Sequence, residues 1–143
     1  MRYVIFKLDK NFFGLPILSV REILKCPEVI PVPQASDCIE GLILLRRRHV
    51  AVMNLRKRLG YLPRQENEDR YVVMVKWQKK VRGFIVDAVA GILEIDDSEI
   101  DETRKVGPEC LDGRALQGVC FKDRKEIFIL KAENFMEEAI SRG

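Results

Sequence analysis

Hydrophobic and polar residues alternate with a period of two along most of the chain. At the start, Val4, Phe6 and Leu8 fall on one face of an extended segment, and a turn signal follows at 9–11. A second extended segment at 12–17 then completes a predicted β-hairpin. The dominant pattern therefore indicates strands rather than helices at the N-terminus.

The same pattern continues through the rest of the chain. It predicts strands at 42–45, 49–55, 71–77, 81–89, 92–95, 116–121 and 127–130, with charged or polar turns at 46–48, 78–80 and 122–125. The polar loop at 60–69 is the best internal boundary, although no sequence repeat across it is convincing. Many short strands separated by turns favour a β-barrel or a β-sandwich.

Helical structure is indicated in three places. The segment 17–24 fits one or two helical turns, and 36–40 fits a single turn closed by Gly41. The prolines at 27, 31 and 33 exclude a regular helix between them and favour an extended edge segment. A C-terminal helix is predicted over 132–142, with a buried stripe of Phe135, Met136, Ala139 and Ile140.

Composition is typical of a globular chain with a real core. Of 143 residues, 47% are apolar and 33% are charged, which suits one domain or two small lobes. The net charge of +3 is too small to indicate a polyanionic partner. The charges are nevertheless segregated, because 41–58 holds six basic residues and no acid, whereas 94–102 holds six acids and no base. Each run taken alone also fits a solvated loop.

No arrangement of residues predicts catalysis, a metal or a cofactor. The single histidine, His49, fits a polar strand end, and the acidic run 94–102 lacks the spacing of a calcium-binding loop. The cysteines have no zinc-finger spacing and are expected to be free, small hydrophobic residues in a reducing cytoplasm. They are Cys26, Cys38, Cys110 and Cys120. No signal peptide or membrane-spanning run is predicted.

The basic run at 46–58 supports two alternatives. Its arginines and lysine fit single-stranded nucleic acid on a small β-barrel, but no aromatic residue for base stacking lies between Gly41 and Gly60. Arginine on a hairpin also suits a protein interface, because guanidinium offers a planar set of donors. The missing aromatic residues favour the protein interface.

Several segments, in order, resemble the CheW family of chemotaxis coupling proteins. They are Tyr3–Leu8, Phe13–Ile17, Val20–Ile23, Ile30–Pro33, Glu40–Arg46, Val50–Arg56, Gly83–Val89, Leu116–Val119 and Ile127–Leu130. The resemblance implies a mostly β fold of two intertwined five-stranded SH3-like barrels around a shared core, with a C-terminal helix. The whole chain, 1–143, would be one domain. The first barrel would span roughly 12–65 and the second roughly 70–130, with strand 2–9 and helix 132–142 completing the fold.

The resemblance also implies a non-enzymatic role. Such a protein links the cytoplasmic tips of methyl-accepting chemoreceptors to a CheA-type histidine kinase, in the cytoplasm, and reaches membrane receptor arrays through its partners. The receptor tip would lie in the groove between the barrels, and one barrel would dock on the kinase. Neither nucleic-acid binding nor membrane insertion is expected.

The expected partner-binding residues follow from matched positions. Val20 and Glu22 match positions near the receptor-binding face, Gly41 opens the most characteristic block, and Arg46 matches an arginine linked to receptor coupling. Arg47 and Arg56 add positive charge in the same block. The chain departs from the family at Leu44, Arg47, Ala51 and Asn54, where asparagine, glycine, proline and aspartate are usual. Because Arg47 replaces a turn glycine, we expect it to oppose a positive φ or to force a different turn.

Overall fold

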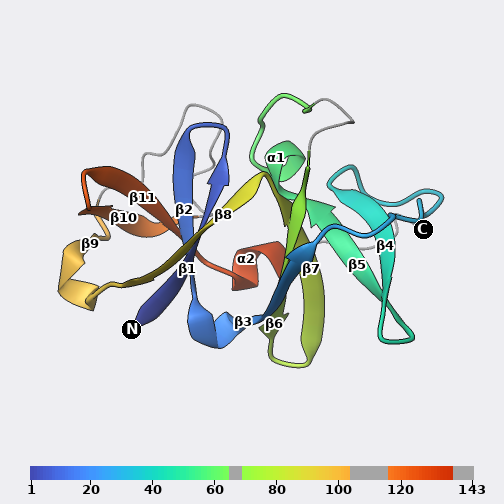
Figure 1. Ribbon diagram of the computed structural model, residues 1–143, viewed down its shortest axis with the longest axis horizontal. Coiled ribbons are helices and arrows are strands. Elements are labelled where there is room, and N and C mark those ends of the chain that lie inside the picture. The colour runs from blue at the N-terminus through green and yellow to red at the C-terminus, as the bar shows by residue number, and fades with distance from the viewer. Residues whose placement is uncertain (65–68, 104–115, 137–143) are drawn as a thin grey trace.

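Two β-sheets lie side by side in the computed structural model, which describes residues 1–64, 69–103 and 116–136 (Figure 1). The six-stranded lobe has the strand order β8-β1-β2-β11-β10-β9. Its strands are β1 (Arg2–Leu8), β2 (Asn11–Pro16), β8 (Ala88–Glu94), β9 (Ile100–Asp101), β10 (Leu116–Lys122) and β11 (Lys125–Leu130). The five-stranded lobe has the order β3-β6-β7-β5-β4. Its strands are β3 (Val20–Lys25), β4 (Ile39–Leu45), β5 (Arg48–Asn54), β6 (Tyr71–Trp77) and β7 (Lys80–Val86).

The chain passes between the lobes twice, so the lobes are intertwined. It leaves the six-stranded lobe through the 3-10 turn η1 (Ile17–Ser19) and returns at Asp87, between β7 and β8. The predicted mostly β, two-lobed fold is therefore confirmed. The expected limits of the lobes differ from the observed sheets, because strands between 20 and 86 form the five-stranded lobe and both ends of the chain form the other. The loop at 60–69 divides the sequence but not the sheets, since β7 pairs in parallel with β5 across it.

The two halves of the chain repeat one topology. β1, β2 and β3 correspond to β6, β7 and β8, and each third strand pairs with the first strand of the other half. The next three elements of the first half are β4, β5 and α1 (Leu55–Arg58). They correspond to β10, β11 and α2 (Glu133–Met136) in the second half. Parallel pairs join β5 to β7 and β11 to β2. The fold thus repeats even where the sequence shows no convincing repeat.

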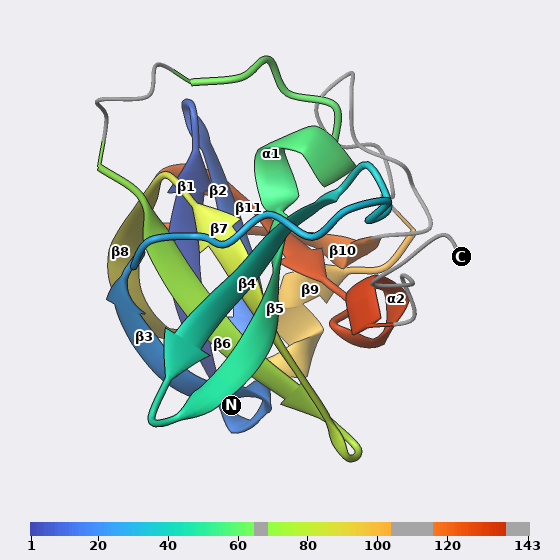
Figure 2. The same cartoon turned by 90° about the vertical axis from the view of Figure 1, so that its right-hand side faces the viewer.

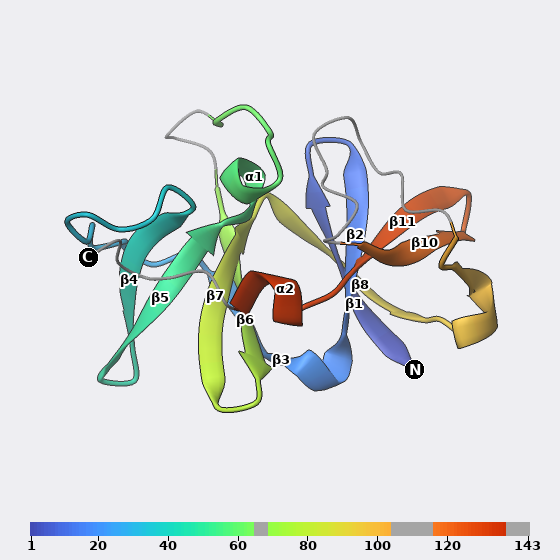
Figure 3. The ribbon, with the colours of Figure 1, turned by 180° about the vertical axis from the view of Figure 1, so that it is seen from behind.

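A hydrophobic core is shared by the lobes and both short helices. It includes Phe6 and Phe13 from one lobe, Phe84 from the other and Phe135 from α2, all fully buried. The rings of Phe84 and Phe135 lie 5.7 Å apart, edge to face, and α2 lies between the lobes (Figure 3). The predicted burial of Phe135 and Met136 is confirmed, while Ala139 and Ile140 lie outside the described residues.

Two segments that fit helical turns in the sequence lead directly into strands. Only Ile17–Ser19 forms a 3-10 turn, and Val20–Lys25 is the edge strand β3, whose residues are alternately half-buried and exposed. Likewise, β4 begins at Ile39, so Gly41 lies inside a strand and does not close a helical turn. In both segments pairing with a neighbouring strand outweighs local helical spacing.

Candidate functional site

The β4–β5 turn adopts a conformation that its residues rarely adopt. Leu45 pairs with Arg48 across it, and the two residues between them, Arg46 and Arg47, have φ of 50° and 67°. Two successive positive φ values match the twist of the flanking strands in a tight hairpin. The expectation that Arg47 would prevent a positive φ is therefore wrong, although the conformation is strained. The arrangement costs about 1–2 kcal/mol per non-glycine residue.

Glu22 and Arg46, both predicted site residues, contact each other. Nη2 of Arg46 donates to Oε1 of Glu22 at 2.9 Å. Glu22 belongs to β3 and Arg46 follows β4, which are the two edge strands of the same sheet, so the sheet must curl to bring them together. Figure 2 shows β3 beside the tip of the β4–β5 hairpin. The Arg46 side chain remains 75% exposed, so the pair contributes at most about 1 kcal/mol to stability.

A cleft of about 300 Å³ lies at this contact, and we call it the basic cleft. Its apolar lining ranges from the buried Met74 to the exposed Val81, and its charged lining is mainly arginine. The apolar residues are Leu45, Val50, Met74 and Val81, and the charged ones are Arg21, Glu22, Arg46 and Arg48. Partly covered apolar surface beside exposed guanidinium groups is typical of a protein interface.

The remaining predicted residues lie in different environments. Val20 is half-buried and packs against the shared core. Arg47 is exposed at the hairpin tip. Gly41 is buried within β4, where an added Cβ would lie 2.2 Å from the backbone oxygen of Ile30. The structure therefore brings Glu22, Arg46 and Arg47 together, whereas Gly41 lies farther along β4.

Arg56 is only 8% exposed, on α1 at the far end of β5 from the basic turn. Its Nη1 donates to Asp9 and to Asp87, each at 2.6 Å, and its Nε donates to the Leu62 carbonyl at 2.9 Å. The seven residues of β5 separate it from the turn by roughly 20 Å. Arg58 also faces inward, 5.2 Å from the ring of Phe135. The basic run 46–58 thus forms no continuous basic surface.

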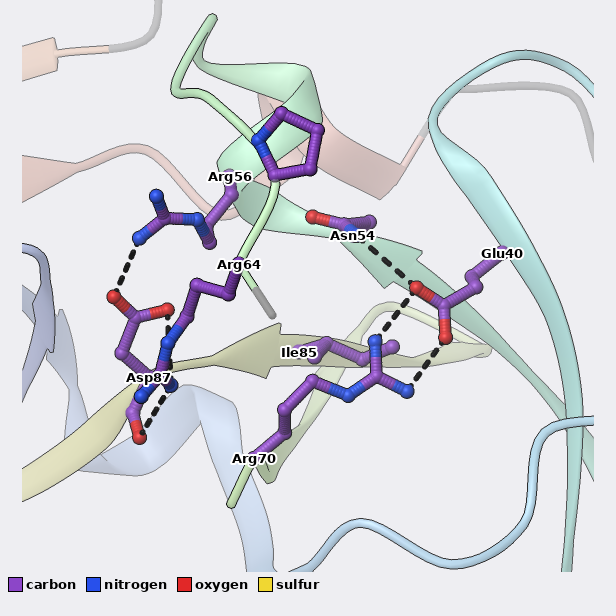
Figure 4. A pocket seen from close by; sticks show the side chains of 8 residues that line it. Glu40, Asn54, Arg56, Arg64, Arg70, Ile85 and Asp87 are labelled. Carbon is purple, nitrogen blue, oxygen red and sulfur yellow. Dashed lines mark hydrogen bonds and ion pairs between the residues drawn. The ribbon is translucent and has the colours of Figure 1, made fainter. Parts of the chain in front are cut away.

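A second, polar pocket of about 410 Å³ lies beside α1 (Figure 4). Arg70 donates to both oxygens of Glu40, at 2.8 and 2.7 Å, and Nδ2 of Asn54 donates to Oε1 of Glu40 at 3.0 Å. Burial alone would raise the pKa of Glu40, but the hydrogen bonds and charge of Arg70, with the bond from Asn54, lower it below its ordinary value. Sequence reasoning missed Glu40 and Arg70 as a pair, because 30 residues separate them.

The Asn54 departure has a structural explanation in this pocket. Its Oδ1 accepts from the backbone N–H of Lys57 at 3.1 Å and so caps α1. Its amide nitrogen donates to Glu40. An ionised aspartate would also cap the helix, but it would donate nothing to Glu40 and would repel its carboxylate.

Other candidate chemistry is sparse in the described part of the chain. No three histidine, cysteine, aspartate or glutamate side chains gather there as a metal site would require. Cys120 is buried and Cys26 is half-buried, and burial raises the pKa of both thiols. Cys110 lies outside the described residues. Within the described ranges, no helix is long and apolar enough to cross a membrane.

A curled, two-lobed β fold with a cleft of apolar and basic residues defines a protein-binding module. Residues 2–139 match the model of the CheW-like domain, and the chain belongs to that family. The family expected from the ordered segments is thereby confirmed.

Known relatives cover nearly the whole chain. The chemotaxis protein CheW of Thermotoga maritima is 27% identical over 133 residues, 93% of this chain and 85% of that protein. The probable chemotaxis protein CheW of Rhizobium etli is 27% identical over 140 residues, 98% of this chain and 90% of that protein. The crystal structure of the scaffolding protein TtCheW from Thermoanaerobacter tengcongensis has 32% identity and a TM-score of 0.81, and the match covers 91% of this chain and 83% of that one. These relatives support a chemotaxis role and give the nucleic-acid alternative no support.

Proposed function

We propose that this chain is a non-enzymatic adaptor that couples chemoreceptors to a CheA-type histidine kinase. Family membership over residues 2–139 supports this role. The intertwined fold suits it, because two lobes that share a core present separate outer surfaces. The adaptor acts in the cytoplasm and joins membrane receptor arrays through its partners.

The observation that carries the proposal is the contact between Glu22 and Arg46 at the basic cleft. One carboxylate oxygen of Glu22 accepts a hydrogen bond from Arg46 and so positions its side chain. Most of the guanidinium remains exposed and can donate to a partner carboxylate. The half-buried Leu45 and Val50 beside it provide apolar contact area. The cleft fits a partner that presents an acidic side chain next to an apolar one.

A second surface is assigned to the receptor tip, where the lobes meet. One edge strand of each lobe carries an exposed apolar residue, Ile23 on β3 and Ile92 on β8, with exposed fractions of 39% and 54%. Leu18 on η1, immediately before β3, is 83% exposed. Exposed apolar residues on both edge strands suit a helical partner that contacts both lobes at once.

The test is charge reversal at the basic cleft. Arg46→Glu repels both Glu22 and an acidic partner, so we expect affinity for the kinase or for a receptor-tip fragment to fall about tenfold or more. Arg124→Glu is the control, because Arg124 is an arginine in the β10–β11 turn of the other lobe and also has a positive φ, of 63° against 50° for Arg46. Isothermal titration calorimetry with each partner measures the change. Unchanged affinity for both partners would remove Arg46 from the site.

A further inference from the structure

The two lobes have few covalent connections. One is η1, whose residues Ile17, Leu18 and Ser19 carry no charge, and the other is Asp87 alone. The shared apolar core holds the lobes together by close packing, although the hydrophobic effect itself is not directional. A directional contact at one connection would restrict the angle between the lobes further.

Arg56 supplies such a contact at the Asp87 connection. Its Nη1 bonds Asp9, in the β1–β2 turn of the six-stranded lobe, and also Asp87, where the chain returns to that lobe. Arg56 itself belongs to α1, directly after β5 of the five-stranded lobe. The backbone N–H of Asp9 donates to Oδ2 of Asp87 at 2.7 Å, which closes a three-residue network. We call this network the interlobe clamp.

Neighbouring groups reinforce the clamp from both lobes. The Asn11 amide, at the start of β2, donates to the Tyr61 hydroxyl at 2.7 Å. The guanidinium of Arg56 lies 5.7 Å from the ring centroid of the same tyrosine. Figure 1 shows the β1–β2 turn, α1 and the start of β8 along the same upper edge, while the turn into β3 lies at the opposite edge. The polar contacts thus strengthen one edge of the junction.

Charge balance explains why a buried arginine is tolerated here. Burial would lower the pKa of Arg56, but hydrogen bonds and charge from Asp9 and Asp87 raise it above its ordinary value. A buried ion pair contributes little net stability, because desolvation offsets most of the attraction. In some proteins a buried ion pair specifies one geometry, and here a shifted lobe would leave the guanidinium buried without its carboxylate partners.

We infer that Arg56 is a positioning residue, and that the interlobe clamp fixes the angle between the lobes. It acts on partner binding indirectly. The basic cleft lies on one lobe, whereas the proposed receptor surface is divided between both lobes. The relative position of these two binding surfaces therefore depends on the angle between the lobes. When the clamp is broken, each lobe keeps its own fold but the lobes lose their fixed orientation.

The test uses charge reversal at Asp9, which is half exposed and whose replacement leaves the core intact. The variant Asp9→Lys places a cation against Arg56. The variant Asp123→Lys is the matched control, because Asp123 opens the β10–β11 turn with φ of 53° against 54° for Asp9. Both variants therefore carry the same backbone strain in the same lobe, and only Asp9 faces Arg56.

Residual dipolar couplings of the full-length chain, measured without partners, report the orientation of each lobe. We expect one alignment tensor to fit both lobes in the native protein and in Asp123→Lys. In Asp9→Lys each lobe should still fit separately, but a joint fit should fail. If Asp9→Lys does not fold, the same measurement is made on Asp9→Asn, which removes only the charge, and the joint fit should again fail. A joint fit as good as in the native protein would overturn the inference.

A second readout rests on the proposed adaptor function. Asp9→Lys should reduce receptor-dependent kinase stimulation about 2- to 30-fold. Its affinity for the partner whose binding Arg46→Glu weakens should remain unchanged, because the basic cleft is intact. If the lobes of Asp9→Lys keep the native orientation, the clamp is refuted. If their orientation changes but the native chain has no effect on a kinase, only the adaptor role is refuted.

Discussion

Replacing Gly41 with alanine should unfold part of β4 because there is no room for a side chain. A Cβ at this position would lie 2.2 Å from the oxygen and 2.8 Å from the carbon of the Ile30 carbonyl, both backbone atoms that cannot rotate away. Ile30 and Leu42 exchange two hydrogen bonds next to it, with N–O distances of 2.7 and 2.8 Å. The alanine must push the segment at Ile30 away from β4 and lengthen both bonds.

The magnitude follows from two terms. Overpacking costs about 1–3 kcal/mol, and two weakened backbone hydrogen bonds cost about 0.5–1.5 kcal/mol each. The sum is a loss of about 4 kcal/mol in the free energy of unfolding. For a chain of this length, that corresponds to a fall in melting temperature of roughly 13 °C.

Urea denaturation of the isolated chain measures this loss, with Gly91→Ala as control. Gly91 also has a positive φ, of 124°, but nothing lies within 4 Å of its added Cβ. The control should lose only about 1–2 kcal/mol, from backbone strain. Equal losses at the two positions would refute the steric argument. A Gly41→Ala protein of native stability that fails to bind partners would instead make Gly41 a contact residue.

Three further changes test other parts of the structure. Arg47→Gly should stabilise the chain by about 1 kcal/mol in urea denaturation, because glycine adopts the positive φ without strain; a loss of stability would contradict the turn geometry. Because the folded-state pKa of Glu40 is below its unfolded value, its pairing with Arg70 stabilises the fold above that unfolded value and is lost as pH falls through the folded pKa. Glu40→Gln should therefore reduce the fall in the free energy of unfolding at acidic pH. An unchanged pH dependence would contradict the lowered pKa of Glu40. Phe135→Ala should cost about 3–5 kcal/mol, since the ring is fully buried between the lobes; a melting temperature within a few degrees of the native value would show that α2 does not complete the core.

Most strands could be predicted from the sequence, because alternation and turn residues are local signals. The failures lie where a local pattern fits two structures. The apolar positions in 17–24 suit a helical turn, yet pairing with β6 makes Val20–Lys25 a strand. The limits of the lobes were not predictable for a related reason, since the parallel pairing of β5 with β7 depends on contacts between distant segments.

The candidate site was predictable only in part, and by resemblance more than by pattern. Glu22 and Arg46 are 24 residues apart, and nothing local indicates that the curled sheet joins them. Arg56 lies in a basic run that suggests a surface, but its acidic partners are 47 and 31 residues away. Burial of a charge depends on such distant partners, so local charge patterning cannot reveal it.

Reconstitution of kinase control tests the central claim most directly. A CheA-type kinase and a chemoreceptor fragment from the same organism are mixed with and without this chain, and kinase autophosphorylation is measured. We expect receptor control of the kinase to appear only when the chain is present, and we expect Arg46→Glu to weaken it whereas Arg124→Glu does not. Receptor control that is the same in the presence and absence of the chain would contradict the adaptor role.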